Sequence, residues 1–158
     1  MKTRKAPRTA PKILVPIDFT ECSRQAVQTA IPLLNLFCAT LVLEYVVENH
    51  GPGSEFLSER RAELEGDLCR LGRKELLRFR RTQIPASCNC ECLVRSGQPD
   101  IEILALAREV KPAMIVMAAH GKDSERGQLG RTAERVAAMA PCPVLLVPVN
   151  ERCVPFFI

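Results

Sequence analysis

Five short apolar runs, separated by stretches with helical periodicity, constrain the fold of this chain more than any other feature. They are residues 12–18, 40–47, 88–94, 113–118 and 144–149. Short apolar runs bounded by turn residues are typical of buried strands. Strands that alternate with helices are joined by right-handed crossovers, which make neighbouring strands parallel. The sequence therefore predicts a three-layer α/β domain, with a doubly wound, five-stranded parallel sheet between helices.

The composition agrees with a sheet covered by helices. Hydrophobic residues make up 47% of the 158 residues, whereas aromatic residues make up 4% and Trp is absent. The core must therefore consist of Leu, Val, Ile and Ala, as in a parallel sheet buried on both faces. A chain of this length forms one ordinary domain. We expect a disordered basic tail over residues 1–10, one domain over residues 11–149 and a short tail over residues 150–158.

Charge and cysteine usage limit the partners and the compartment. The net charge of +4 is spread along the chain, and one Tyr and six Phe are few for stacking on bases. No nucleic-acid partner is therefore expected. No apolar run has the ~20 residues of a membrane-spanning helix. The basic N-terminus lacks the apolar segment of a secretory signal, so we expect a cytoplasmic protein whose eight cysteines are thiols rather than disulfides.

The helical stretches between the runs carry start and stop signals. Thr20 can cap the first helix, which Pro32 should kink. Pro99 fits the first position of the third helix. The second helix is long and charged, and we expect its charges to form the solvated face. Its apolar stripe is predicted to consist of Leu57, Leu64, Leu68 and Leu71.

A ligand site in such a fold is expected where the strand order reverses. In open α/β sheets, ligands bind beyond the carboxyl ends of the strands at that point, and the first and fourth strands are the natural candidates. The loop from Gly121 to Gly130 leads into a helix at Thr132, so it can present backbone N–H groups to a phosphate. The residues at the two strand ends are Pro16, Asp18 and Phe19, and Met117 to Gly121.

Several segments, in their order and spacing, resemble the universal stress protein family. Residues 12–20 (KILVPIDFT) look like the family's first strand, and residues 43–48 (LEYVVE) resemble the end of its second. His120-Gly121 and residues 133–147, with AERV and then APCPVLLV, are similar to its C-terminal signature. The resemblance covers about residues 11–149. It implies a Rossmann-like fold of the adenine nucleotide alpha hydrolase-like type.

The same resemblance implies a function and a set of site residues. The protein would be a stress-response homodimer, joined through strand 144–149, that binds ATP or another adenine nucleotide such as AMP. Asp18 and Val46 would lie near the adenine, and Met117 and the loop glycines near the ribose and phosphates. The residues implied to bind the nucleotide are Pro16, Asp18, Val46, Met117, Ala118, Gly121, Gly130, Arg131 and Thr132.

The phosphate-binding motif departs from that of the family's ATP-binding members, which carry Gly-x-x-Gly, nine residues and then Gly-Ser/Thr. Ala118 occupies the first glycine position, and eight residues separate Gly121 from Gly130. The alanine adds a methyl group where a ribose or phosphate would pack. Arg131 replaces the small hydroxyl residue. This arginine could either block the phosphate pocket or clamp the phosphate itself.

Other residues leave alternatives open. Asp18 is equally suited to a turn role, and His120 to bonding a turn backbone. Cys88, Cys90 and Cys92 should face one side of their strand, where packing is favoured over a metal site because no Cys-x-x-Cys pair is present.

No Ser-His-Asp or Cys-His grouping is evident from the spacing of the two histidines, so no catalytic residue and no metal ligand is predicted. At most, slow ATP hydrolysis would accompany binding. Besides a nucleotide-responsive stress protein, two functions remain open. One is a dimeric interaction or signalling module of the same family without nucleotide. The other is a thiol-based metal or redox protein.

Overall fold

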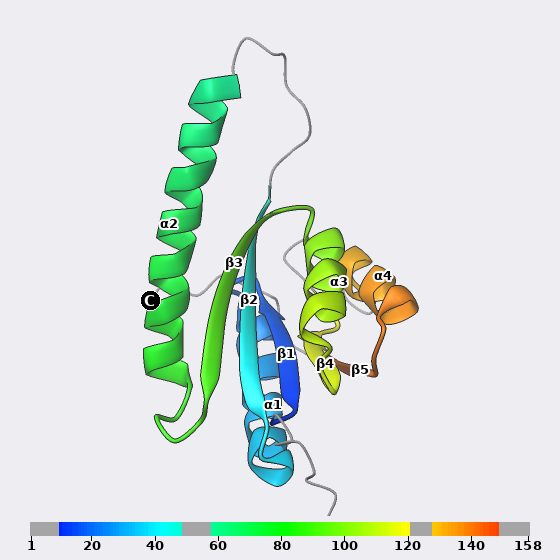
Figure 1. Cartoon of the computed structure of the whole chain (residues 1–158). Helices are drawn as coiled ribbons and strands as arrows, with labels where there is room; N and C mark the ends of the chain where they lie inside the picture. Colours follow the sequence, from blue (N-terminus) through cyan, green and yellow to red (C-terminus); the bar gives the residue numbers. More distant parts are fainter. Residues whose placement is uncertain (1–9, 49–57, 121–127, 149–158) are drawn as a thin grey trace, which may run out of the picture.

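The computed structural model describes residues 10–48, 58–120 and 128–148, and these form an alternating series of strands and helices (Figure 1). Each of the five predicted strands and four predicted helices is present, with ends that shift by up to three residues. The tails and two connecting loops fall outside the described residues. The elements are β1 Lys12–Ile17, α1 Glu21–Phe37, β2 Thr40–Glu48, α2 Ser58–Gln83, β3 Cys90–Gly97, α3 Pro99–Val110, β4 Met114–Ala118, α4 Arg131–Met139 and β5 Val144–Val147.

The strands form one sheet in the order β3-β2-β1-β4-β5. All four neighbouring pairs are parallel, which confirms the predicted sheet. From β1 the chain adds β2 and β3 on one side, and it then returns to add β4 and β5 on the other. The strand order therefore reverses between β1 and β4, as the sequence predicted.

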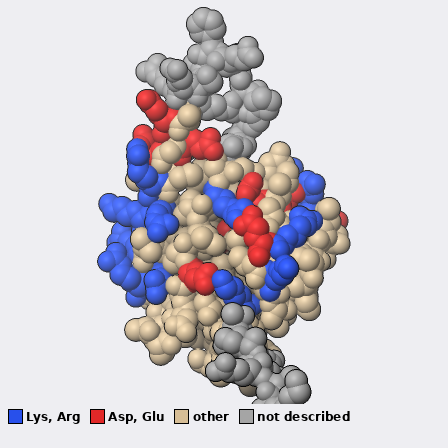
Figure 2. Space-filling model, in the orientation of Figure 1, with Lys and Arg blue, Asp and Glu red and all other residues tan. Residues whose placement is uncertain are grey.

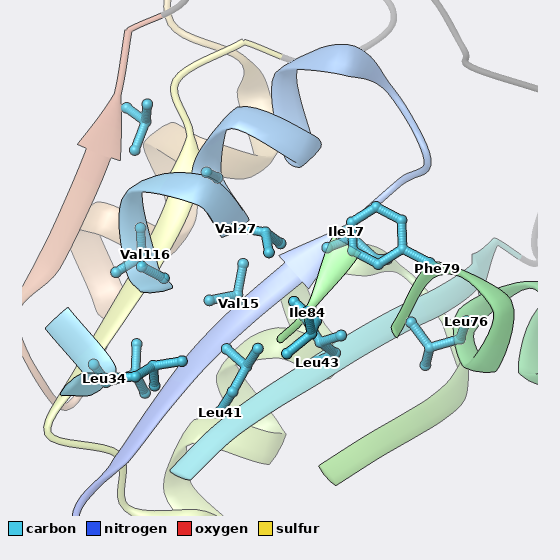
Figure 3. Close-up of a cluster of buried hydrophobic side chains, with 14 residues drawn as sticks. Val15, Ile17, Val27, Leu34, Leu41, Leu43, Leu76, Phe79, Ile84 and Val116 are labelled. Atoms are coloured by element: carbon cyan, nitrogen blue, oxygen red, sulfur yellow. The ribbon is translucent and has the colours of Figure 1, made fainter. Parts of the chain in front are cut away.

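Two hydrophobic clusters, one on each face of the sheet, make the three layers. On one face, Val15 and Leu43 of the sheet pack with Val27 of α1 and with Leu76 and Phe79 of α2 (Figure 3). On the other face, the sheet packs against α3 and α4. The buried members of that second cluster include Leu14, Val42, Ile103, Ile115 and Val136. The sheet is therefore buried on both faces, which explains its nearly continuous apolar strands.

The predicted signals at the helix ends mostly hold. Thr20 Oγ1 accepts a hydrogen bond of 3.3 Å from the backbone N–H of Ser23, so Thr20 caps α1. The helix continues through Pro32 to Phe37. Pro99 is the first residue of α3, and Lys111 ends that helix in the left-handed conformation.

The predicted apolar stripe of α2 is wrong. Leu64, Leu68 and Leu71 are 59%, 42% and 59% exposed, and Leu57 lies outside the described residues. The face that packs on the sheet is instead formed by Gly72, Leu76 and Phe79. These residues also recur at helical spacing, but the glycine has no side chain to mark the face in the sequence. The N-terminal part of α2 extends past the strands (Figure 1), where the helix has no sheet to pack on.

Among the described residues, no helix is long and apolar enough to cross a membrane. The described cysteines differ in state. Cys38, Cys69, Cys88, Cys90, Cys92 and Cys142 are free, which confirms the expectation of thiols for these six. Cys22, buried in the first turn of α1, is disulfide-bonded. The expectation of a thiol is therefore wrong for this residue.

Candidate functional site at the switch point

Three of the predicted site residues lie on the α3/α4 face of the sheet, near the carboxyl ends of the central strands. Met117 of β4 and Val46 of β2 belong to the hydrophobic cluster on that face. Leu14 of β1 pairs with Ile115 of β4, so the alternation along both strands brings Pro16 to the level of Met117 on the same face. The three side chains thus form an apolar wall at the point where the strand order reverses.

The start of α4 is tied to the end of β4. The backbone N–H of Ala119 donates to the carbonyl of Val147, at 2.9 Å, and the N–H of Gly130 donates to the carbonyl of Ala119, at 2.8 Å. Gly130 is the N-cap of α4 and offers no side-chain cap. The first N–H groups of a helix have no intrahelical partner and carry partial positive charge. This helix terminus therefore lies beside the end of β4.

His120 makes a second link between the end of β4 and the start of α4. Its Nδ1 lies 2.5 Å from the carbonyl oxygen of Gln128. That contact is the turn-backbone role that the sequence offered for this histidine. It joins the residue that follows β4 to the residues that precede α4, although the intervening loop lies outside the described residues.

Asp18 organises the turn between β1 and α1. Its Oδ1 accepts hydrogen bonds from the backbone N–H of Thr20, at 3.0 Å, and from the Thr20 hydroxyl, at 2.5 Å. The backbone of Phe19 between them is in the left-handed region, with φ of 57°. The carboxylate therefore stabilises a strained turn, which is the structural role that the sequence left open. A contact with a ligand remains a prediction.

The remaining predicted residues follow β4 and open α4. Ala118, Gly130 and Thr132 are half-buried, whereas Arg131 is exposed. Arg131 and Thr132 are the first two residues of α4. Gly121 falls outside the described residues.

Glu44 is a candidate that the sequence interpretation missed. It lies on β2 opposite Pro16 and is completely buried. Neither of its carboxylate oxygens has a hydrogen-bond partner among the described residues. Burial raises the pKa of Glu44 to about 8, against the charge of Arg95. The sequence feature that could have identified Glu44 is that it is a charged residue inside the apolar run of residues 40–47.

Arg95 connects Glu44 to two further carboxylates. Its Nε lies 3.9 Å from Glu44 Oε1, and its Nη1 lies 3.6 Å from Glu102 Oε2. The same guanidinium also pairs with Glu109. The charges of Glu102 and Glu109 add to the rise in the pKa of Glu44. Arg95 therefore forms ion pairs with three carboxylates, and its contact with the buried Glu44 is the longest of the three.

A hollow beside α1 lies on the opposite face of the sheet from the apolar wall. It is open to solvent, has a volume of about 540 Å³ and contains none of the predicted site residues. Arg24 and Glu21 form an ion pair beside it. It is lined by Glu21, Arg24, Gln25, Gln28, Thr29 and Val147. Within the described ranges, no group of three or more His, Cys, Asp or Glu residues is arranged to hold a metal ion.

The parallel sheet in this strand order, covered by helices on both faces, defines a Rossmann-like α/β protein. A profile of the Universal stress protein family matches residues 10–148. Universal stress protein MJ0531 of Methanocaldococcus jannaschii is 33% identical over 143 residues, which are 89% of this chain and 84% of that protein. This chain therefore belongs to the universal stress protein family, as the resemblance of its strand ends implied.

Solved structures of the family share the fold. Universal stress protein UspA from Lactobacillus plantarum superposes with a TM-score of 0.74 at 23% identity, over 87% of this chain and 97% of that one. A universal stress protein in complex with cAMP superposes with a TM-score of 0.61 at 23% identity, over 88% of this chain and 98% of that one. At these identities the likeness supports the Rossmann-like architecture alone.

Proposed function

We propose that this protein is a stress-response binding protein whose ligand is an adenine nucleotide, ATP or AMP, bound at the carboxyl ends of β1 and β4. One observation carries the proposal. The 2.8 Å bond from Gly130 to Ala119 holds the uncapped start of α4 beside the end of β4. A phosphate at this position would be stabilised by the N–H groups and the partial positive charge of the helix terminus.

Each predicted residue has a part in this proposal. Pro16, Val46 and Met117 supply the apolar wall for the base and ribose. Asp18 would accept a hydrogen bond from the adenine amino group while it keeps its turn contacts. Ala118 would lie against the ribose, and Gly121, outside the described residues, completes the implied set. The solved family member in complex with cAMP supports the class of ligand.

Arg131 would act as a clamp on the phosphates. It is exposed at the first position of α4, so a ligand at the start of this helix could contact its guanidinium. A guanidinium gives a phosphate two parallel donors, where a small hydroxyl residue gives one. Thr132 follows it in the first turn and offers a hydroxyl. The departure from the usual family motif would then change the donor set rather than abolish the site.

Calorimetric titration with ATP, ADP and AMP tests this function. We expect binding of at least ATP, and Arg131→Ser should weaken ATP about tenfold, the loss of one charge-assisted contact, while AMP weakens less. Arg108→Ser, at an exposed position of α3, is the matched control and should change nothing. Tighter binding by Arg131→Ser would show that the arginine blocks the pocket. No binding of any of the three at millimolar concentration would overturn the function and favour an interaction module without nucleotide.

The proposal includes a homodimer joined through β5. This strand pairs only with β4 among the described strands, and its Leu145 is 41% exposed. An edge strand with an exposed apolar residue favours pairing with a second copy. Sedimentation should show a dimer that Leu145→Asp converts to a monomer, whereas Leu36→Asp, at an exposed position on α1, should leave the dimer intact. A monomeric wild-type protein would contradict this part.

A further inference from the structure

The exposed leucines of α2 form a row of their own. Leu64, Leu68 and Leu71 are 59%, 42% and 59% exposed, and their spacing of four and three residues places them on one face of the helix. Leu76 and Phe79 of the same helix are completely buried against the sheet, so the leucine row lies beside the packed face rather than within it. Contiguous exposed apolar side chains are typical of an interaction surface.

A row of exposed charges runs along α2 beside these leucines. Its members are spaced four, three and four residues apart, and each of the first three directly precedes a leucine. From the N-terminal side they are Glu63, Asp67, Arg70 and Lys74. Two acids are thus followed by two bases. Figure 2 shows the same division, with acidic side chains toward the upper end of α2 and basic ones below them.

This order of charges is self-complementary when two copies of the helix run antiparallel. A two-fold axis between residues 68 and 69 places Glu63 opposite Lys74 of the partner subunit, and Asp67 opposite Arg70 of the partner subunit. The symmetry repeats both pairs, so every charge of the row faces one of opposite sign. In a parallel pair, each charge would instead face its own copy. The same axis brings the two leucine rows together, because Leu68 lies next to it.

The charges are free to exchange partners. Asp67 and Arg70 already form an ion pair within the helix, but their side chains are 57% and 78% exposed. An ion pair at such exposure contributes little to stability, so its replacement by a pair between two helices costs little. The N-terminal part of α2 also extends past the strands (Figure 1), which leaves room for a second helix.

We propose that the leucine row and the charge row of α2 form an interaction surface for α2 of a second copy of this chain, in antiparallel orientation. The helix packs on β2 and β3, and β3 and β5 are the two edges of the sheet. The contact is therefore additional to the dimer proposed through β5, and it would join such dimers into larger assemblies. It is also independent of the nucleotide site.

The strength of this contact follows from its size. The charge row spans about three helical turns, which is less than a standard interface of about 1,600 Å². We therefore expect weak pairing, with a dissociation constant of about 0.1 mM. At the lower concentrations of an ordinary sedimentation run, the β5 contact alone would determine the assembly.

Sedimentation equilibrium with Leu145→Asp, the substitution that removes the proposed β5 contact, isolates the pairing of α2. This parent protein should be monomeric at about 10 µM and form dimers above about 0.1 mM. Glu63→Lys with Asp67→Lys makes the charge row wholly basic, and Arg70→Glu with Lys74→Glu makes it wholly acidic. Each double variant alone should pair at least about tenfold more weakly than the parent, because facing charges repel. An equimolar mixture of the two should pair about as tightly as the parent.

A matched control separates this pairing from general attraction between oppositely charged proteins. Arg108→Glu with Lys111→Glu, both exposed positions at the end of α3, changes the net charge as much as the acidic variant does. Its mixture with the basic variant should not restore pairing. Leu68→Ser, at an exposed position, should weaken pairing of the parent without changing its circular dichroism spectrum.

Two results would overturn the proposal. One is a parent protein that stays monomeric up to about 1 mM. The other is a mixture of the basic and acidic variants that pairs no more tightly than the control mixture. In either case the leucine row would not be a surface for a second copy of this chain.

Discussion

Gly72 of α2 lies directly against the ring of Tyr45 on β2. A Cβ atom at Gly72 would lie 2.7 Å from Cε1 and 2.8 Å from Cδ1 of that ring. The same ring also packs against Phe19, with ring centroids 4.6 Å apart. Phe19 belongs to the turn that the Asp18 carboxylate stabilises. The packing of α2 on the sheet is therefore linked to the turn at the proposed nucleotide site.

Gly72→Ala should therefore destabilise the protein, although alanine is the better helix former. We expect a loss of about 1–3 kcal/mol, the usual cost of overpacking a core, in urea unfolding. Gly66→Ala in the same helix is the matched control, because a Cβ there meets nothing within 4 Å. That variant should gain about 0.5–1 kcal/mol. Equal effects of the two substitutions would contradict the close contact.

Glu44 should make stability fall as pH rises. Its pKa is about 8 in the folded protein against 4.5 for the ordinary group, so between these values the folded state holds a proton that the unfolded state has lost. The free energy of unfolding should then decrease by up to about 1.4 kcal/mol per pH unit. Urea unfolding at several pH values between about 5 and 9 measures the slope.

Glu44→Gln should flatten this slope, since the amide does not titrate. Glu48→Gln, at an exposed position at the end of the same strand, is the matched control and should keep the wild-type slope. A variant of Glu44 with an unchanged slope would mean that the buried carboxyl does not hold its proton.

The ion pair between Arg135 and Asp100 should stabilise the packing of α4 on α3. Arg135 Nη1 lies 2.9 Å from Asp100 Oδ2, and the Asp100 side chain is only 11% exposed. Removing the cation would leave a buried carboxylate without its partner, so Arg135→Gln should cost about 1–3 kcal/mol. Arg78→Gln, at an exposed position of α2, should cost less than about 0.5 kcal/mol. Thermal or urea unfolding of both variants checks the difference.

Asp18→Ala should weaken the start of α1. The substitution removes the acceptor for the backbone and hydroxyl of Thr20, and the loss of such a capping contact costs about 1–2 kcal/mol. Asp18→Asn keeps an acceptor oxygen and should cost less. If Asp18→Ala unfolds at the same urea concentration as the wild type, the carboxylate does not support the turn.

The alternation of apolar runs and helical stretches was enough to predict the sheet and its switch point. Parallel strands buried on both faces leave a strong signal, because nearly every residue in them is apolar. The cap at Thr20 and the proline at the start of α3 could also be predicted from the sequence, because both depend only on neighbouring residues.

The sequence could not show which face of α2 meets the sheet. The exposed leucines of α2 have the same helical periodicity as leucines that pack, and Gly72 has no side chain that an apolar pattern could include. The burial of Glu44 was missed for a similar reason, because the apolar residues around it in β2 determine the pattern that predicts the strand. Its burial depends on α3, which arrives from a distant part of the chain.

The central claim of the proposed function is that the crevice between β1 and β4 receives the nucleotide. Backbone amide NMR during titration with ATP tests it most directly. We predict shifts at Asp18, Val46, Ala118 and Thr132, with the amides around Cys90 and Cys92 unchanged. Shifts confined to the hollow beside α1, or no shifts at millimolar ATP, would contradict the claim.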